Sequence, residues 1–285
     1  MSKILHGFGI ILGTLGVVFL SLKLREYSNQ IGFSGLHFQG WLALAGLGSV
    51  YGLSGLLLAL AWRDLLKYFG VSVSKRWAVW AYGVSQLARY VPGNIFHLAS
   101  RQAIGAGAGI PQWPLAKSAV WELGLIAAIG GLFGCIFLLL PDLSVGRALL
   151  ILAALAVGTL SLAFRADGRC LVRAVSGYAL FLFVSGLVFA FVLSLTAPLD
   201  VVNATVMWPI VGAYIVAWLV GLVTPGAPAG VGVREVVLYA LLNPLVSNSD
   251  LLTAIVLGRM VTVAGDLTYY AVALGMTSRS KQPYA

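Results

Sequence analysis

Two stretches of this sequence decide its fold: YVPGNIFHLASR at residues 90–101 and VTPGAPAGVGVR at residues 223–234. They contain the only two Pro-Gly pairs of the chain. In each stretch an arginine follows the glycine by eight residues, and a proline follows that arginine by ten. The step from Arg101 to Arg234, which we call the repeat offset, therefore also relates the prolines and glycines around them. This spacing predicts an internal repeat with one interrupted helix in each half.

The composition around these stretches is typical of a polytopic membrane protein. Of 285 residues, 60% are hydrophobic and 9% are charged, and the mean hydropathy is +0.96. A soluble domain carries about 25% charged residues, so a cytosolic enzyme, a disordered chain and a disulfide scaffold are excluded. The net charge of +9 suits an anionic membrane surface rather than nucleic acid. The three histidines and two cysteines are widely scattered, so no metal and no cofactor are expected.

Segments of about 20 apolar residues predict transmembrane helices. Eight such segments are found, at residues 4–22, 40–62, 76–91, 115–140, 148–164, 174–198, 204–224 and 251–276. They predict an all-α, polytopic fold with one membrane domain, residues 1–285, integral to a bacterial cytoplasmic (inner) membrane. Moving the second, third and fourth segments by the repeat offset places them on the sixth, seventh and eighth. The halves of the pseudo-repeat are therefore expected at residues 1–143 and 144–285.

The number of spans predicts how the halves are related. Four spans in each half predict parallel halves, whereas one miscounted span would make them inverted. With both termini in the cytoplasm, eight lysines and arginines lie inside and five outside, which satisfies the positive-inside rule only weakly. Arg165, Arg169 and Arg173 form the outer cluster that disagrees with this orientation.

Each interrupted stretch predicts a re-entrant half-helix. The apolar run after each Pro-Gly pair is about 17 residues long, which is short for a complete crossing. Irregular backbone at membrane depth lines a cavity or is buried in protein, and the start of a half-helix attracts anions. An arginine fork suits phosphate oxygens. We expect a head-group phosphate between the two half-helices, close to Gly93, Asn94, His97, Arg101, Gly226, Gly230, Gly232, Arg234, Glu235 and Arg259.

A purely structural role for these arginines is the alternative, because charges inside membranes often pair with one another. Glu122, Glu235, Arg259 and Asp266 are possible members of such ion pairs. Arg259 and Asp266 are seven residues apart and share a helix face. Glu122 and Asp266 are also candidates for coupling transport to protons. Arg89 is expected at a span end, with its side chain reaching the membrane interface.

The second stretch resembles a known family signature. TPGAPAGVGVRE at residues 224–235, followed by AIVLGR at 254–259, is similar to the Pro-Gly-Gly-x-Gly-x-Arg-Glu element of the lysylphosphatidylglycerol synthase transmembrane-region family, also called uncharacterised protein family 0104. RYVPG at residues 89–93 is similar to its earlier Arg-Tyr-x-Pro-Gly element. This chain differs by the insertion of Ala-Pro-Ala at 227–229. The resemblance implies these motif residues: Pro225, Gly226, Gly230, Gly232, Arg234, Glu235 and Arg259.

The same resemblance implies a flippase-like module without the soluble synthase domain, so lysyl transfer is not expected. A transporter of an anionic amphiphile is the leading hypothesis, with a phospholipid or a polyprenyl-phosphate-linked sugar as substrate. A non-transporting membrane partner of a cell-envelope glycosyltransferase is the alternative. A lipid-modifying enzyme is less favoured, because only nine acidic residues exist and none form a close pair at a membrane face.

Overall fold

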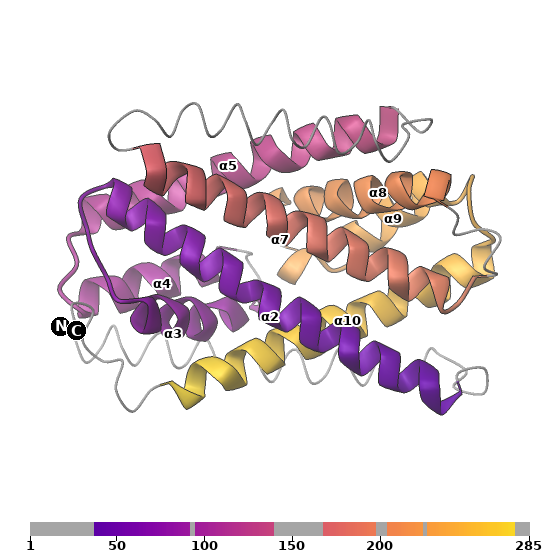
Figure 1. Cartoon of the computed structure of the whole chain (residues 1–285), viewed down its shortest axis with the longest axis horizontal. Helices are drawn as coiled ribbons and strands as arrows, with labels where there is room; N and C mark the ends of the chain where they lie inside the picture. The colour runs from indigo at the N-terminus through magenta and orange to yellow at the C-terminus, as the bar shows by residue number, and fades with distance from the viewer. Residues whose placement is uncertain (1–36, 92–94, 140–167, 198–203, 225–226, 277–285) are drawn as a thin grey trace.

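The computed structural model describes residues 37–91, 95–139, 168–197, 204–224 and 227–276, and its regular structure in these ranges is entirely helical (Figure 1). The elements are α2 (Phe38–Tyr68), α3 (Lys75–Gln86), η2 (Leu87–Tyr90), α4 (Phe96–Gly107), α5 (Gln112–Leu139), α7 (Gly168–Ser194), α8 (Ala204–Val223), η3 (Pro228–Gly230), α9 (Val233–Leu242) and α10 (Asn248–Gly275).

Five helices are long and apolar enough to cross a membrane, as expected of an integral membrane protein. They cover Phe38–Tyr68, Gln112–Phe137, Gly168–Ser194, Val206–Val223 and Asn248–Gly275. These correspond to the second, fourth, sixth, seventh and eighth predicted spans. The first and fifth predicted spans, 4–22 and 148–164, lie outside the described residues. The all-α class is thus confirmed for the described part of the chain.

The third predicted span, 76–91, is not one helix of spanning length. Helix α3 has 12 residues and continues for one 3-10 element, η2, of four residues. Ser74 caps its start by accepting a hydrogen bond from the backbone N–H of Trp77 at 3.2 Å. Pro92 follows its end, and the residue before a proline disfavours the helical conformation. Helix α4 then packs back along α3 and η2, so the chain reverses here.

The described helices therefore include two helical hairpins. The first hairpin consists of α3, η2 and α4, and the second hairpin consists of α8, η3 and α9, in which α9 packs back against α8. η2 contacts η3, so the hairpins meet at their tips. Their return arms, α4 and α9, have 12 and 10 residues, which is about half the length that a bilayer crossing needs.

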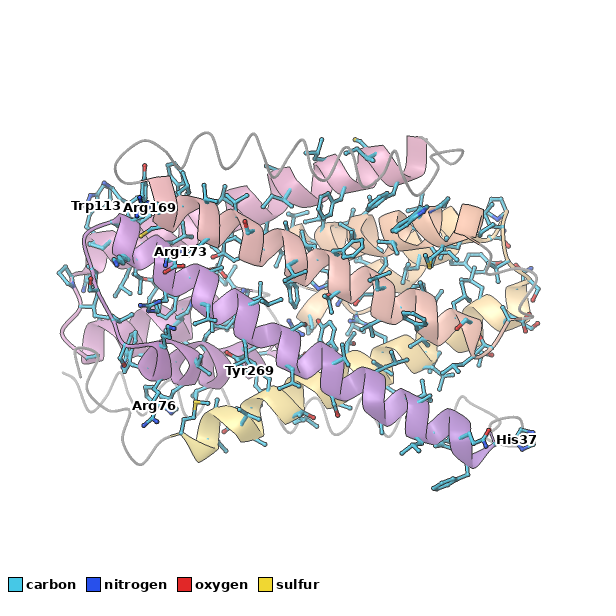
Figure 2. All side chains as sticks on the ribbon, in the orientation of Figure 1. His37, Arg76, Trp113, Arg169, Arg173 and Tyr269 are labelled. Atoms are coloured by element: carbon cyan, nitrogen blue, oxygen red, sulfur yellow. The ribbon has the colours of Figure 1, made fainter. Side chains whose placement is uncertain are left out.

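The long helices run in two opposite directions along the molecule. His37, which precedes α2, lies at one end of Figure 2, whereas Trp113 of α5 and Arg169 of α7 lie at the other end. Helix α2 therefore runs opposite to α5 and α7. Helix α10 begins beside the end of α7, where the Thr196 hydroxyl donates to the carbonyl oxygen of Asp250 at 3.3 Å. Helix α10 consequently runs in the direction of α2.

One end of the molecule collects the exposed cations. We define the basic end by Lys67, Lys75, Arg76, Arg169 and Arg173, which are exposed at the termini of α2, α3 and α7. Figure 2 shows Arg76, Arg169 and Arg173 at this end. The first two turns of α2, α8 and α10, at the opposite end, contain no lysine or arginine. The count of eight spans separated Arg169 and Arg173 from Lys67, whereas the structure places them at the end where α2 finishes.

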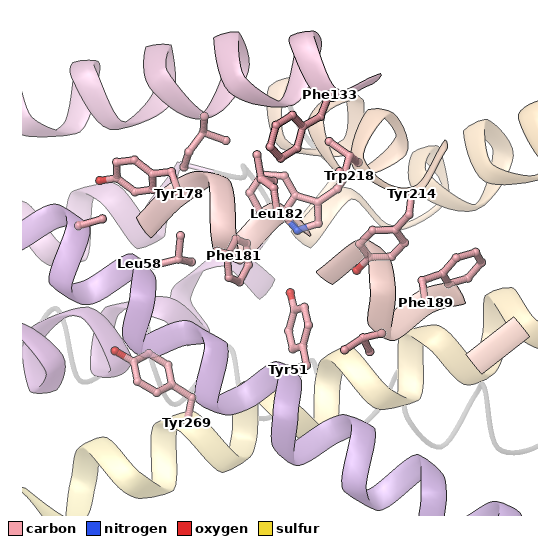
Figure 3. Packing of buried hydrophobic residues seen from close by; sticks show 14 of the residues in the cluster. Tyr51, Leu58, Phe133, Tyr178, Phe181, Leu182, Phe189, Tyr214, Trp218 and Tyr269 are labelled. Carbon is pink, nitrogen blue, oxygen red and sulfur yellow. The ribbon is translucent and has the colours of Figure 1, made fainter. Parts of the chain in front are cut away.

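Aromatic side chains fill the core between α2, α7 and α8 (Figure 3). The ring of Phe181 lies 6.0 Å from that of Tyr51 and 5.8 Å from that of Trp218, measured between centroids. Phe189 stacks on Tyr214 at 5.2 Å. Such contacts add to the burial of large apolar surfaces. These ring contacts hold α7 against α2 and α8.

Helices α2 and α10 pack with their backbones in contact. A Cβ atom added at Gly52 would lie 2.5 Å from the carbonyl oxygen of Gly265, and one added at Gly265 would lie 2.7 Å from the carbonyl oxygen of Gly48. Small residues at helix interfaces in membranes permit this close approach. This contact fixes the position of α10 along α2 at Gly265, the residue before Asp266.

Substitution of Gly52 by alanine is expected to destabilise the protein by about 1–3 kcal/mol, because the new methyl group collides with backbone that cannot move aside. Gly46→Ala is the matched control, since nothing lies within 4 Å of a Cβ atom added there. Thermal unfolding of the detergent-solubilised variants measures the difference. Equal melting temperatures for the two variants would contradict the backbone contact.

Cysteine labelling tests on which side of the membrane each end of the molecule lies. In a background with Cys135 and Cys170 replaced by serine, Ser72→Cys lies beside the basic end and Ser249→Cys at the opposite end. The positive-inside rule predicts that a membrane-impermeant maleimide labels Ser249→Cys in intact cells, and Ser72→Cys only after lysis. Labelling of both from the outside would show that the ends are assigned wrongly.

Candidate functional site

A cavity lies where the two hairpins meet. Its volume is about 40 Å³, which is enough for about three water molecules or a compact anion. Trp218, Gly221 and Leu222 of α8 form part of an otherwise largely apolar wall. Polar side chains from both hairpins and from α5 face it: Tyr82, Gln86, Arg89, His97, Glu122 and Arg234. The cavity therefore joins the two parts of the chain that carry the Pro-Gly stretches.

Arg101 is buried beside this cavity and is neutralised within the first half of the chain. Its Nη1 donates to Glu122 Oε1 at 3.2 Å, and its Nη2 pairs with Oε2 of the same carboxylate. The Tyr82 hydroxyl also donates to Glu122 Oε1, at 2.8 Å. The guanidinium lies 4.4 Å from the ring centroid of Tyr82 and 5.0 Å from that of Trp62. Arg101 is not among the cavity-lining residues, whereas its partner Glu122 is.

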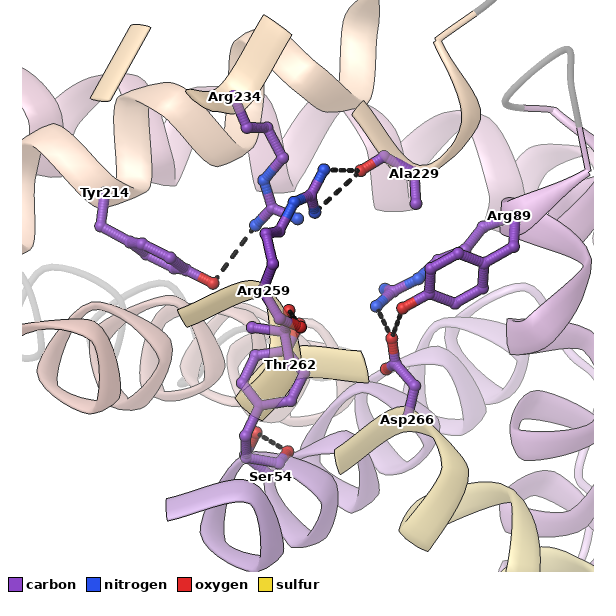
Figure 4. Close-up of polar contacts among 10 residues, drawn as sticks. Ser54, Arg89, Tyr214, Ala229, Arg234, Arg259, Thr262 and Asp266 are labelled. Atoms are coloured by element: carbon purple, nitrogen blue, oxygen red, sulfur yellow. Dashed lines mark hydrogen bonds and ion pairs between the residues drawn. The ribbon is translucent and has the colours of Figure 1, made fainter. Parts of the chain in front are cut away.

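Arg89 lines the cavity, and the expectation that its side chain reaches the membrane interface is wrong. Its residue is only 8% exposed. Its Nη2 pairs with Asp266 Oδ2, and the Tyr90 hydroxyl donates to the same oxygen (Figure 4). Asp266 belongs to α10, so this group ties the tip of the first hairpin to that helix.

Arg259 forms the corresponding tie on the second hairpin. Its Nε pairs with Glu235 Oε1. Its two Nη atoms each donate to the Ala229 carbonyl oxygen at 3.3 Å (Figure 4). Ala229 belongs to η3 and has a positive φ of 49°, which is unusual for a residue with a side chain. Arg259 and Asp266 thus share a face of α10, as their spacing indicated, but each contacts a different hairpin.

Arg234 differs from the other three buried arginines. It is 6% exposed, and its Nη2 donates to the Tyr214 hydroxyl at 3.2 Å (Figure 4). The guanidinium lies 5.5 and 5.8 Å from the ring centroids of Tyr214 and Trp218. No carboxylate among the described residues lies within ion-pair distance of it. A buried charge without a counterion is costly, so this guanidinium favours an anion from outside the chain.

Gly221 and Gly230 leave room for the Arg234 side chain. A Cβ atom added at Gly230 would lie 2.8 Å from Arg234 Cδ and from the Cα of Gly221. Gly230 and Gly232 also have positive φ values of 72° and 86°, which glycine adopts at little cost. The close approach at Gly230 is made by α8, which packs against it.

The structure brings together only part of the predicted site. His97 and Arg234 line the cavity, whereas Arg101, Glu235 and Arg259 form ion pairs around it. Gly93, Asn94, Pro225 and Gly226 lie outside the described residues. Sequence reasoning missed Gln86, Arg89, Tyr214 and Trp218 as site residues. The signal for Arg89 was present, since it opens the RYVPG stretch.

Comparisons with protein-family models, curated proteins and solved structures find no match for this chain. The described residues also contain no group of three or more histidine, cysteine, aspartate or glutamate side chains that could hold a metal ion. The polar groups that line the cavity are guanidinium, carboxylate, hydroxyl, imidazole and amide groups.

The charge pattern predicts opposite effects for two matched substitutions. Arg101→Gln leaves Glu122 buried without its cation and is expected to cost about 3–5 kcal/mol of stability. Arg234→Gln removes a buried charge that has no carboxylate partner and is expected to leave the melting temperature unchanged or raise it. Thermal unfolding of both variants in detergent is the measurement. A loss of stability in Arg234→Gln as large as in Arg101→Gln would contradict the assignment.

Proposed function

We propose that the protein transports an anionic amphiphile across a membrane and binds its head-group phosphate in the cavity between the two hairpins. The observation that carries this proposal is Arg234, a buried guanidinium that lines the cavity without a carboxylate partner among the described residues. Arg89, which pairs with Asp266, lines the same cavity. A phospholipid and a polyprenyl-phosphate-linked sugar both offer the phosphate that such a site fits.

The head group and the tails of the substrate prefer different surroundings, which determines how it is placed in the site. Its phosphate lies among the polar side chains of the cavity, and its tails stay in the bilayer outside the apolar wall. Arg101 and Glu122 act as positioning residues, because their ion pair holds the wall of the cavity. Arg259 and Glu235 do the same for η3. The family resemblance implies a flippase-like module, which supports the proposed transport.

We further propose that the two halves are an inverted repeat and that the hairpins are re-entrant. Moved by the repeat offset, the start of α2 at Phe38 falls three residues after the start of α7 at Gly168. The start of α5 at Gln112 likewise falls three residues before that of α10 at Asn248. The members of each pair run in opposite directions (Figure 1). Opposite directions favour the inverted relation over the parallel one that eight spans predicted.

Such a repeat offers a route for alternating access. The first hairpin begins and ends at the basic end, where α2 ends and α5 begins. The second hairpin begins and ends at the opposite end. Each hairpin therefore closes the cavity toward one side of the membrane. Movement of one hairpin at a time would expose the bound head group to one side and then the other.

A transport assay in proteoliposomes tests the function. The probes are fluorescently labelled phosphatidylglycerol, a labelled polyprenyl phosphate sugar and labelled diacylglycerol as the uncharged control. The unmodified protein is expected to move at least one phosphate-bearing probe and not diacylglycerol. Arg234→Gln is expected to lower that rate at least about tenfold, the loss expected for one charge-assisted hydrogen bond.

Arg76→Gln is the control for a general loss of positive charge, because Arg76 is exposed at the basic end. It is expected to retain the rate of the unmodified protein. Transport by Arg234→Gln at that same rate would refute the site. Failure of the unmodified protein to move any probe would refute transport and favour a membrane partner of a glycosyltransferase.

A further inference from the structure

The equivalent arginines of the two halves, Arg101 and Arg234, have different surroundings. Arg101 and Glu122, which form the ion pair of the first half, are 21 residues apart. Moved by the repeat offset, Glu122 falls on Ile255, just as Arg101 falls on Arg234. An apolar side chain therefore stands in the second half where the first half has the counterion.

The surroundings of Ile255 agree with this correspondence. Ile255 is 4% exposed and lines a second, smaller cavity together with Arg234 and Tyr214. Tyr214 contacts Arg234 much as Tyr82 contacts Arg101, and it lies one position before the one that the repeat offset assigns to Tyr82. The side chain at position 255 and Arg234 thus line the same small cavity.

The sizes of the two cavities decide where an external anion binds. The small cavity beside Ile255 has a volume of about 10 Å³, against about 40 Å³ for the cavity between the hairpins. The smaller volume is at the limit for a single water molecule. An anion attracted by Arg234 therefore occupies the larger cavity, which Arg89 also lines.

The charge that such an anion must carry follows from the buried groups. With His97 counted as neutral, the charged side chains that line the cavity, together with their ion-pair partners and the ion pair of the second hairpin, are four arginines and three carboxylates: Arg89, Arg101, Arg234, Arg259, Glu122, Glu235 and Asp266. They leave one net positive charge. A phosphodiester carries one negative charge, whereas a phosphomonoester carries about 1.5–2 at pH 7. Only the phosphodiester leaves the buried site close to neutral.

We propose that Ile255, by standing where the first half has Glu122, reserves Arg234 for an external anion and makes the site selective for a monoanionic phosphodiester. This inference rests on the proposed function and narrows its substrate class. The phosphate diester takes the role for Arg234 that the Glu122 carboxylate takes for Arg101. Phosphodiester phospholipids and polyprenyl phosphodiester sugars belong to this class, whereas lipids that end in a phosphomonoester do not.

Calorimetric titration of the detergent-solubilised protein tests the inference. The probes are dioctanoyl phosphatidylglycerol, dioctanoyl phosphatidic acid, dioctanoylglycerol and inorganic phosphate. We expect phosphatidylglycerol to bind at least about tenfold more tightly than each of the others, which corresponds to one charge-assisted interaction. Equal binding of inorganic phosphate and phosphatidylglycerol would identify a free anion as ligand and overturn the lipid assignment.

Ile255→Glu restores the missing acid, and Ile255→Gln is its uncharged control of the same size. The glutamate variant is expected to bind phosphatidylglycerol at least about tenfold more weakly, because its carboxylate neutralises Arg234 from within. The glutamine variant is expected to bind within about threefold of the unmodified protein, since a neutral side chain leaves Arg234 charged. Unchanged binding by Ile255→Glu, or tighter binding of phosphatidic acid, would overturn this inference and leave the proposed function intact.

A melting-temperature series keeps the inference testable if the variants fold poorly. Ile255→Glu is expected to melt at or above the temperature of Ile255→Gln, and addition of Arg234→Gln to the glutamate variant is expected to lower it. A glutamate variant that unfolds or melts below the glutamine variant would show that positions 234 and 255 do not pair. If the unmodified protein binds no phosphate-bearing lipid, the proposed function itself fails, whatever this series gives.

Discussion

Helix α10 holds the tips of both hairpins through two ion pairs, and the site between them depends on this hold. Asp266 binds Arg89 and Tyr90 of the first hairpin, and Arg259 binds Glu235 and η3 of the second. The two positions are about 10 Å apart along one face of the helix. Because these side chains are largely buried, a group left without its partner in either pair would be costly. The hairpin tips are therefore fixed against one helix.

Among the described residues, one buried charge lacks a carboxylate partner. Arg89, Arg101 and Arg259 pair with carboxylates, whereas Arg234 contacts the Tyr214 hydroxyl and two aromatic rings. Residues that serve binding often lower the stability of a protein without its ligand. A ligand that neutralises such a group stabilises the folded state by mass action. In the proposed function, the cost of burying Arg234 is thus the source of the affinity for the phosphate.

The sequence predicted the helical class and five of the long helices. These features are local, because hydropathy can be read from neighbouring residues. The reversal between η2 and α4 could not be predicted, since residues 76–91 are apolar and long enough to resemble a crossing. Nor could the pairing of Arg89 with Asp266, which are 177 residues apart. Such pairings depend on the register between helices, which a single sequence does not encode in any short pattern.

The contact between α2 and α10 has a consequence for how this sequence can change over time. Where Gly52 and Gly265 meet, backbone touches backbone, so no larger side chain fits at either position. Exposed positions of the same helices, such as Leu53, are free to exchange among apolar residues. Distant descendants of this chain should therefore retain these two glycines after most of the apolar surface has drifted beyond recognition.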